Sequence, residues 1–110
     1  MALVKPKKML FPPSASPDVT AYRLFIEPTA TPTNLAYTSQ NFDLGMPTAN
    51  ADGKLEVDLG GIDVLRTLDG VYDIGVVAID DAGNQSSMST KMAVPLDFSA
   101  PDAPGPVEVV

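Results

Sequence analysis

The sequence predicts an all-β domain folded as a two-sheet sandwich. Its 110 residues include eleven prolines and eight glycines, and no stretch keeps an apolar i, i+3, i+4 pattern for two helical turns. Short runs alternate apolar and polar residues instead, and each ends in a cluster of turn formers. Six strands can be counted in this way, and a single flat sheet of that size would leave one face uncovered. We therefore expect two sheets that pack against each other.

Two predicted strands, Val19–Glu27 and Lys54–Leu59, have one apolar and one polar face, which is typical of a half-buried antiparallel strand. The residues expected on the inner faces are Tyr22, Leu24 and Ile26 in the first strand and Leu55, Val57 and Leu59 in the second. Phe25 falls on the outer face of the first strand. An earlier, interrupted strand is expected in Leu3–Phe11, and a short, weak strand in Leu35–Tyr37.

The run Val71–Ile79 is expected to be a central strand, because both of its faces are apolar. Its inner row is Tyr72, Ile74, Val76 and Ala78. The turn Asp80–Asn84 follows and leads to a last long strand, which Pro95 ends. The inner row of that last strand is predicted to be Met88, Thr90, Met92 and Val94. Ahead of the central strand, Leu65 and Leu68 are expected to plug one end of the core from a crossover loop.

The composition excludes several classes of function. Lysine and arginine number 7 against 14 aspartates and glutamates, a net charge of −7, so we expect no nucleic-acid partner, which a basic face would recognise. Lys5, Lys7 and Lys8 form the only basic cluster in the sequence, and three lysines are too few for a nucleic-acid or lipid patch. No apolar run reaches the roughly 20 residues of a membrane span, so no membrane insertion is expected.

No catalytic, metal or cofactor site is expected either. Cysteine and histidine are both absent, which removes disulfides, thiolate ligands and the commonest general base. Asp80, Asp81 and Asn84 offer oxygen ligands for calcium, but they lack the spacing of an EF-hand and their sequence is typical of a turn. Three nearby serines have no histidine to activate them. The N-terminus lacks the features of a secretory signal, which predicts a cytoplasmic or virion-associated protein unless the chain is a fragment of an exported one.

One long stretch has a family resemblance. Leu68–Ser86, which reads LDGVYDIGVVAIDDAGNQS, resembles the penultimate strand and following loop of fibronectin type III domains and related bacterial immunoglobulin-like domains. Asp18–Pro28 is similar to the third strand of a fibronectin type III domain, and Lys8–Asp18 to the end of its second strand and a Pro-rich loop. The resemblance extends over Leu3–Val94. It implies an immunoglobulin-like two-sheet β-sandwich of fibronectin type III topology, with about 6–7 antiparallel strands, in residues 1–98.

The resemblance also assigns structural roles. Tyr72 would be a corner tyrosine, with its ring in the core and its hydroxyl bonded to a backbone group of the crossover before it. The other structural residues would be Tyr22, Leu24, Ile74 and Val76. The family usually carries a tryptophan in its second strand, but this chain has no tryptophan. Leu10 or Phe11 must therefore fill that space.

The segment Ser99–Val110, SAPDAPGPVEVV, looks like the Pro-rich lead and first strand that the family has ahead of the residues matched by Leu3–Phe11. Three interpretations stay open. The terminal valines fold back in cis as a first strand, across a linker (Leu96–Pro106) that reaches about 35 Å at most. Alternatively, Val107 and Val109 pair with the exposed edge of a neighbouring chain, which gives filaments or rings when repeated head to tail. In the third interpretation, residues 99–110 are a frayed tail or a linker.

Two functions compete. The first is a non-catalytic protein-interaction or spacer module that binds through the loops Pro12–Asp18, Gly45–Gly53 and Asp80–Ser86, which are expected at one pole. The candidate interaction residues are Pro13, Ser14, Ser16, Asp80, Asp81 and Asn84. A carbohydrate partner has less support than a protein partner, because these loops carry no tryptophan or tyrosine. The alternative is a self-assembling structural subunit of a virion, tail or surface appendage that exchanges its C-terminal strand.

Overall fold

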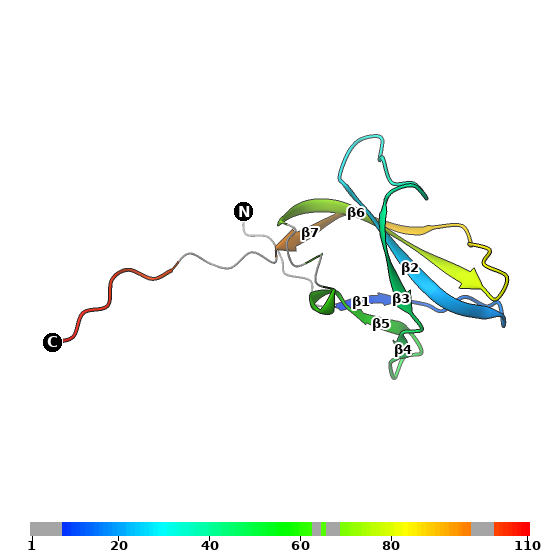
Figure 1. Cartoon of the computed structure of the whole chain (residues 1–110), viewed down its shortest axis with the longest axis horizontal. Helices are drawn as coiled ribbons and strands as arrows, with labels where there is room; N and C mark the ends of the chain where they lie inside the picture. The colour runs from blue at the N-terminus through cyan, green and yellow to red at the C-terminus, as the bar shows by residue number, and fades with distance from the viewer. Residues whose placement is uncertain (1–7, 63–64, 66–68, 98–102) are drawn as a thin grey trace.

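The chain forms two antiparallel sheets that face each other (Figure 1). A computed structural model describes residues 8–62, 65, 69–97 and 103–110, and within these residues it contains seven strands and no α-helix. One sheet has the strand order β1-β5-β4 and the other the order β3-β2-β6-β7. The prediction of an all-β two-sheet sandwich is confirmed.

The longest strands all belong to the four-stranded sheet. The three-stranded sheet consists of β1 (Lys8–Phe11), β5 (Leu55–Asp58) and β4 (Thr48–Ala49), and a 3-10 turn, η1 (Leu59–Gly61), follows β5. The four-stranded sheet consists of β3 (Gln40–Gly45), β2 (Val19–Pro28), β6 (Asp69–Asp80) and β7 (Ser89–Asp97). Strand β6 lies between β2 and β7, as its two apolar faces predicted.

The core between the sheets contains most of the predicted inner faces, together with Leu96, which lies beyond the predicted end of the last strand. Its buried members are Tyr22, Leu24, Ile26, Leu55, Val57, Leu59, Leu65, Ile74, Val76, Ala78 and Leu96. Leu65 is fully buried, as expected for a residue that plugs the core, whereas its predicted companion Leu68 lies outside the described residues. Tyr72 packs against the core, but part of the crossover that would bond its hydroxyl lies outside the described residues.

Leu10 and Phe11 were the two candidates to fill the core position of β1, and the structure places Phe11 there. Its ring lies 5.2 Å from that of Tyr22, centroid to centroid, and packs against the core. Leu10 is half exposed on the opposite face of β1. Alternation along a strand explains the difference, because neighbouring side chains point to opposite faces.

The predicted strand at Leu35–Tyr37 is wrong, because these residues belong to the connection between β2 and β3. The strand next to β2 is β3, which pairs with it from Tyr22↔Gly45 to Ile26↔Gln40. Glutamine, asparagine, aspartate and glycine dominate β3 and are poor strand formers, so local composition is a weak predictor of this strand. Hydrogen bonding to the long neighbour β2 makes this segment a strand.

The prediction for β7 is also corrected. The strand continues through Pro95 to Asp97, which an edge strand tolerates because one side of its backbone needs no ladder partner. A β-bulge lies between the pairs Tyr72↔Val94 and Ile74↔Lys91, and Ala93 within it has a φ of 56°. The bulge inverts the alternation. Ahead of it Ser89 and Lys91 pair with the inward residues Val76 and Ile74, and beyond it Val94 and Leu96 face the core. Met88, Thr90 and Met92 are therefore not inner residues, and only Val94 of the predicted row is.

Asp73 ties the bulge to the loop after β2. This residue is 1% exposed, and its carboxylate accepts hydrogen bonds from the Ala93 N–H at 3.0 Å, the Thr29 hydroxyl at 2.9 Å and the Thr33 hydroxyl. The bond from Thr33, followed by that from Ala93, holds the pKa of the Asp73 carboxyl below its usual value, and burial only partly opposes this. The carboxylate is therefore charged in the folded chain.

A second apolar cluster covers the outer face of β2 and β6, on the side away from the other sheet. Phe25 and Val77 are each 1% exposed there, outside the inter-sheet core. Tyr37 covers Phe25 edge-on, with ring centroids 5.9 Å apart, and its hydroxyl donates a 2.9 Å bond to the Ser86 carbonyl. The loop before β3 thus covers this face. Both faces of the four-stranded sheet therefore bury side chains.

Gly75 lets Met88 enter this outer cluster. A Cβ at Gly75 would lie 2.1 Å from Met88 Sδ and 3.2 Å from Leu35 Cδ2. We expect Gly75→Ala to lower the free energy of unfolding by about 1–3 kcal/mol, the usual cost of overpacking. Urea unfolding measures this. Adding Met88→Ala should recover part of the loss, so strictly additive effects of the two changes would contradict the contact.

Candidate functional site

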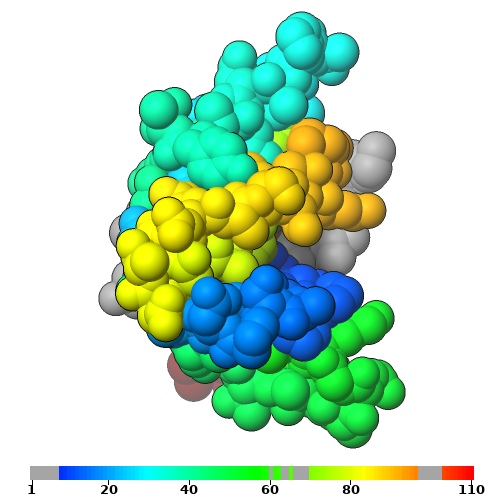
Figure 2. Space-filling view, turned by 90° about the vertical axis from the view of Figure 1, so that its right-hand side faces the viewer, coloured from blue at the N-terminus to red at the C-terminus, as the bar shows by residue number. Residues whose placement is uncertain are grey.

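The predicted interaction loops meet at one pole of the sandwich. Strand pairing sets this arrangement, since Val19 lies opposite Asp80 and Phe11 opposite Leu55. The loop after β1 and the turn after β6 are joined by a 3.1 Å bond from the Asp81 N–H to the Asp18 carbonyl. Figure 2 looks onto this pole, where the blue and yellow segments lie side by side. The third loop, residues 45–53, contains strand β4 and is less of a loop than predicted.

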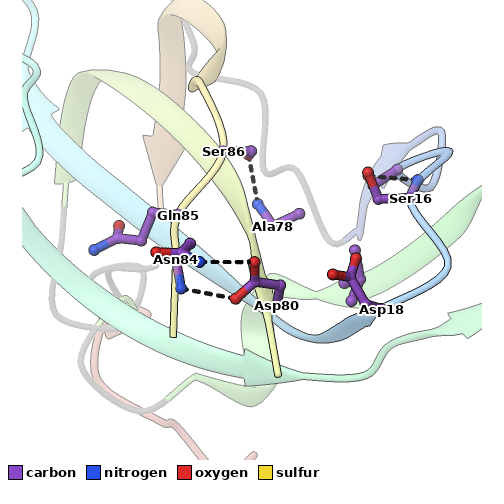
Figure 3. Close-up of a pocket in the computed structure, with 9 residues that line it drawn as sticks. Ser16, Asp18, Ala78, Asp80, Asn84, Gln85 and Ser86 are labelled. Carbon is purple, nitrogen blue, oxygen red and sulfur yellow. Dashed lines mark hydrogen bonds between the residues drawn. The ribbon is translucent and has the colours of Figure 1, made fainter. Parts of the chain in front are cut away.

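A hollow of about 160 Å³ lies between the two loops (Figure 3). Its lining is Ser14, Ser16, Asp18, Val19, Ala78, Asp80, Asn84, Gln85 and Ser86. Four of the six predicted interaction residues therefore lie together here. Pro13 lines a neighbouring hollow, and Asp81 lines neither of the two.

Several polar groups of the loop pole hold the loops themselves. Asp80 accepts bonds from the Ala82 N–H at 2.9 Å, the Asn84 N–H at 2.8 Å and the Asn84 side-chain amide at 3.1 Å. The bonds from Asn84 hold the pKa of the Asp80 carboxyl below its usual value. Both carboxylate oxygens thus serve the turn, as the turn interpretation of this sequence predicted. Within the described residues, no three acidic side chains come together as metal ligands.

The serine hydroxyls at this pole are used in the same way. Ser86 Oγ accepts a 2.9 Å bond from the Ala78 N–H and donates a 2.8 Å bond to the Ser87 carbonyl. Ser14 Oγ accepts from the Ser16 N–H at 3.2 Å, and the Ser14 N–H donates to the Tyr22 hydroxyl at 2.9 Å. These groups are donors and acceptors for the loop backbone, and the geometry around them is that of a rigid pole.

A longer, mainly apolar depression runs along the opening between the two sheets, and we call it the β1–β7 groove. Three adjoining hollows of about 260, 120 and 200 Å³ compose it. The first and second hollows share Phe11, Val76 and Ser89, and the second and third share Met9, Ile74 and Lys91. Figure 2 shows the pole end of this depression between the blue and the orange segments.

The groove exists because the two sheets end unpaired on the same side. Strand β1 is the terminal strand of one sheet and β7 of the other, and among the described residues neither has a strand paired on its outer side. On the opposite side, the short connection from β3 to β4 joins the two sheets. The sandwich is therefore closed along one side and open along the other, with inward core residues at the base of the opening.

The two edges of the groove differ in their capacity to accept another strand. Strand β7 carries a bulge, Pro95 and the inward-facing Lys91, and each of these features discourages pairing at an edge. Strand β1 has no bulge or proline and pairs regularly with β5 from Lys8↔Asp58 to Phe11↔Leu55. Among the residues that the structure describes, its outer edge therefore presents unpaired backbone donors and acceptors beside apolar side chains.

Sequence reasoning missed the groove as a site. Its lining residues Met9, Phe11 and Ile74 are apolar residues of strands, and an apolar residue in a strand predicts core. The indirect signal was the family resemblance, in which the segment that looks like a first strand is Ser99–Val110.

Comparisons of this chain with models of known protein families, with curated proteins and with solved structures found no match. None of the helical segments in the described residues has the length and apolar character needed to cross a membrane.

Proposed function

We propose that this protein is a non-catalytic protein-interaction module that binds an extended partner segment by strand addition at β1. The observation that carries the proposal is the β1–β7 groove, an apolar opening bordered by a regular strand edge that has no paired neighbour in the described part of the chain. Strand addition uses the backbone groups of such an edge for affinity and adjacent pockets for side-chain selection. We also propose that the sandwich is of fibronectin type III type, which the strand orders β1-β5-β4 and β3-β2-β6-β7 support.

The size and lining of the groove support a peptide side chain as occupant. A hollow of about 120 Å³ has room for several waters, since one water needs roughly 10–15 Å³. Waters against Met9, Phe11 and Ile74 find few polar partners, so their replacement by apolar side chains is favourable. A binding role for the loop-pole residues stays a prediction, and their mutual hydrogen bonds make the groove the better-supported surface.

Titration with a synthetic peptide of alternating valine and threonine tests this function. Amide NMR of the 110-residue chain should show the largest shifts at Lys8–Phe11 and Ile74, with small shifts at Asp80–Asn84. We expect Met9→Lys, on the inward face of β1, to weaken peptide binding about tenfold, because the apolar contact is lost.

The matched control is Leu10→Lys, on the outward face of the same strand, which should change the affinity by less than about twofold. Thermal unfolding of both variants establishes that each is folded at the temperature of the titration. Shifts confined to the loop pole, or equal effects of the two substitutions, would contradict the proposed function.

A further inference from the structure

We propose that the β1–β7 groove is filled by residues 107–110 of a second copy of this chain, which pair with β1 as an added strand. The inference rests on the proposed function and names its partner. It connects two unsatisfied features of the described chain, an open strand edge and a short strand-forming segment without contacts.

The donor segment is a run of valines that the fold leaves in solvent. Val107 and Val109 are 88% and 95% exposed. No hydrogen bond within the described residues involves residues 103–110, and in Figure 1 the red segment extends away from the sandwich. Valine has a high preference for strands, and an exposed strand-forming segment is a ready partner for an unpaired edge.

The donor matches the acceptor in length and in parity. Strand β1 has four residues, and Val107–Val110 also has four. Alternate side chains of a strand face the same side, so Val107 and Val109 enter the groove together, toward Met9 and Phe11. Glu108 and Val110 then face outward, on the side of β1 that carries Lys8 and Leu10.

The charges are complementary on the outward side. Lys8 is the exposed cation of β1 and lies 3.7 Å from Glu56 on β5, the strand on its other side. In an antiparallel added strand that starts beside Phe11, Glu108 lies opposite Leu10 and diagonal to Lys8 on the same outward face, and opposite charges on neighbouring strands are favourable. Lys8 thus gives the acceptor edge one cation within a chain whose net charge is −7.

The length of the linker before the donor segment favours the donor of a second copy over the donor of the same chain as the occupant of the groove. Strand β7 ends near the Lys8 end of β1, since Lys8 and Val94 line one hollow. An antiparallel partner of β1 must start at the other end, beside Phe11. Residues 98–106 would have to run back along all of β7, whose nine residues span about 30 Å. These nine linker residues reach about 30 Å when fully extended and would also have to turn at both ends.

Proline in the linker adds to this argument. Pro104 and Pro106 stand immediately before the donor, and Pro-rich segments behave as extended, semi-rigid spacers. They hold the valines away from their own sandwich and present them to another copy. Because donor and acceptor are different surfaces, the contact repeats head to tail and produces rings or filaments.

Sedimentation equilibrium of the full chain over micromolar to millimolar concentrations tests the proposal. We expect an average mass that climbs above the 11.5 kDa of one chain. Val109→Asp should weaken association at least about tenfold, because a charge would enter the groove. Val110→Asp, one position away, places its charge outward on the side of Lys8 and should not weaken association.

A charge exchange identifies the acceptor edge. Lys8→Glu and Glu108→Lys should each weaken self-association, and an equimolar mixture of the two variants should recover it, since one supplies the acidic edge and the other the basic donor. Equal effects of Val109→Asp and Val110→Asp would overturn the inference.

The remaining outcomes separate this inference from the proposed function. A constant mass of 11.5 kDa overturns the second copy as occupant. If the valine–threonine peptide still binds at β1, the proposed function survives that result. A constant mass together with a loss of thermal stability in Val109→Asp, but not in Val110→Asp, would instead assign the groove to the tail of the same chain. Association that the Val109→Asp and Lys8→Glu variants both retain, without peptide binding at β1, would overturn both proposals.

Discussion

Replacing Phe25 with alanine is expected to lower the free energy of unfolding by about 3–5 kcal/mol, the usual cost of removing a buried aromatic side chain. Phe25 is 1% exposed, although it lies on the face of β2 that points away from the other sheet. Tyr37 covers its ring from the loop between β2 and β3. Urea unfolding followed by circular dichroism gives the free-energy difference.

The comparison variants are Leu24→Ala and Met92→Ala. Leu24 is fully buried between the sheets, and its truncation should cost a similar amount, about 2–5 kcal/mol. Met92 is 42% exposed on β7, and its truncation should cost less than about 1 kcal/mol. If Phe25→Ala behaves like Met92→Ala, the outer cluster is not a second core.

The second large effect concerns acid stability and Asp73. Hydrogen bonds from Thr33 and Ala93 keep the pKa of this carboxyl below its ordinary value of 3.8. The folded state therefore binds a proton less readily than the unfolded state. The stabilisation is fully present above about pH 4 and is lost as the pH falls through the lowered pKa.

Asp73→Asn should therefore destabilise the chain at neutral pH and flatten the loss of stability below pH 4. An amide cannot accept three hydrogen bonds with the strength of a carboxylate. Thermal unfolding between pH 2 and pH 7 measures both effects. Asp52→Asn, at an exposed turn, controls for the removal of one negative charge. A variant that is as stable as the original chain at neutral pH would contradict the role of Asp73 as the anchor of the bulge.

The proposed binding surface determines which substitutions best test binding. The sequence predicted interaction residues in the pole loops because polar loop residues bind ligands on many folds. In the structure, the side-chain oxygens of Asp80, Ser86 and Ser14 accept hydrogen bonds from nearby backbone N–H groups. The β1–β7 groove has the opposite character, with apolar side chains along its base and, among the described residues, a strand edge without a paired neighbour at its rim. Substitutions on β1 are therefore the informative ones.

Local periodicity was sufficient for much of the fold. The alternation in Val19–Glu27 assigned Leu24 and Ile26 to the core and Phe25 to the other face, and all three lie where predicted. The apolar outer row of the central strand predicted its place between β2 and β7. These predictions succeed because burial of one face fixes the register of a strand and its side chains alternate strictly.

Local periodicity failed where contacts distant in sequence decide the structure. Strand β3 forms because β2 offers it hydrogen bonds, although its own residues favour strands weakly. The inner row of β7 shifts because Asp73, some 20 residues earlier, binds the Ala93 N–H and stabilises the bulge. Alternation cannot be carried through such an extra residue.

The sequence by itself determined that this chain is a two-sheet sandwich and which faces of Val19–Glu27, Lys54–Leu59 and Val71–Ile79 are buried. Period-two burial and turn residues are local properties, and the linear order of residues contains them. Only the tertiary structure decided that β1 and β7 end on the same side and leave the groove between them. An open edge is defined by which strands pair, and pairing depends on the contacts of the whole chain.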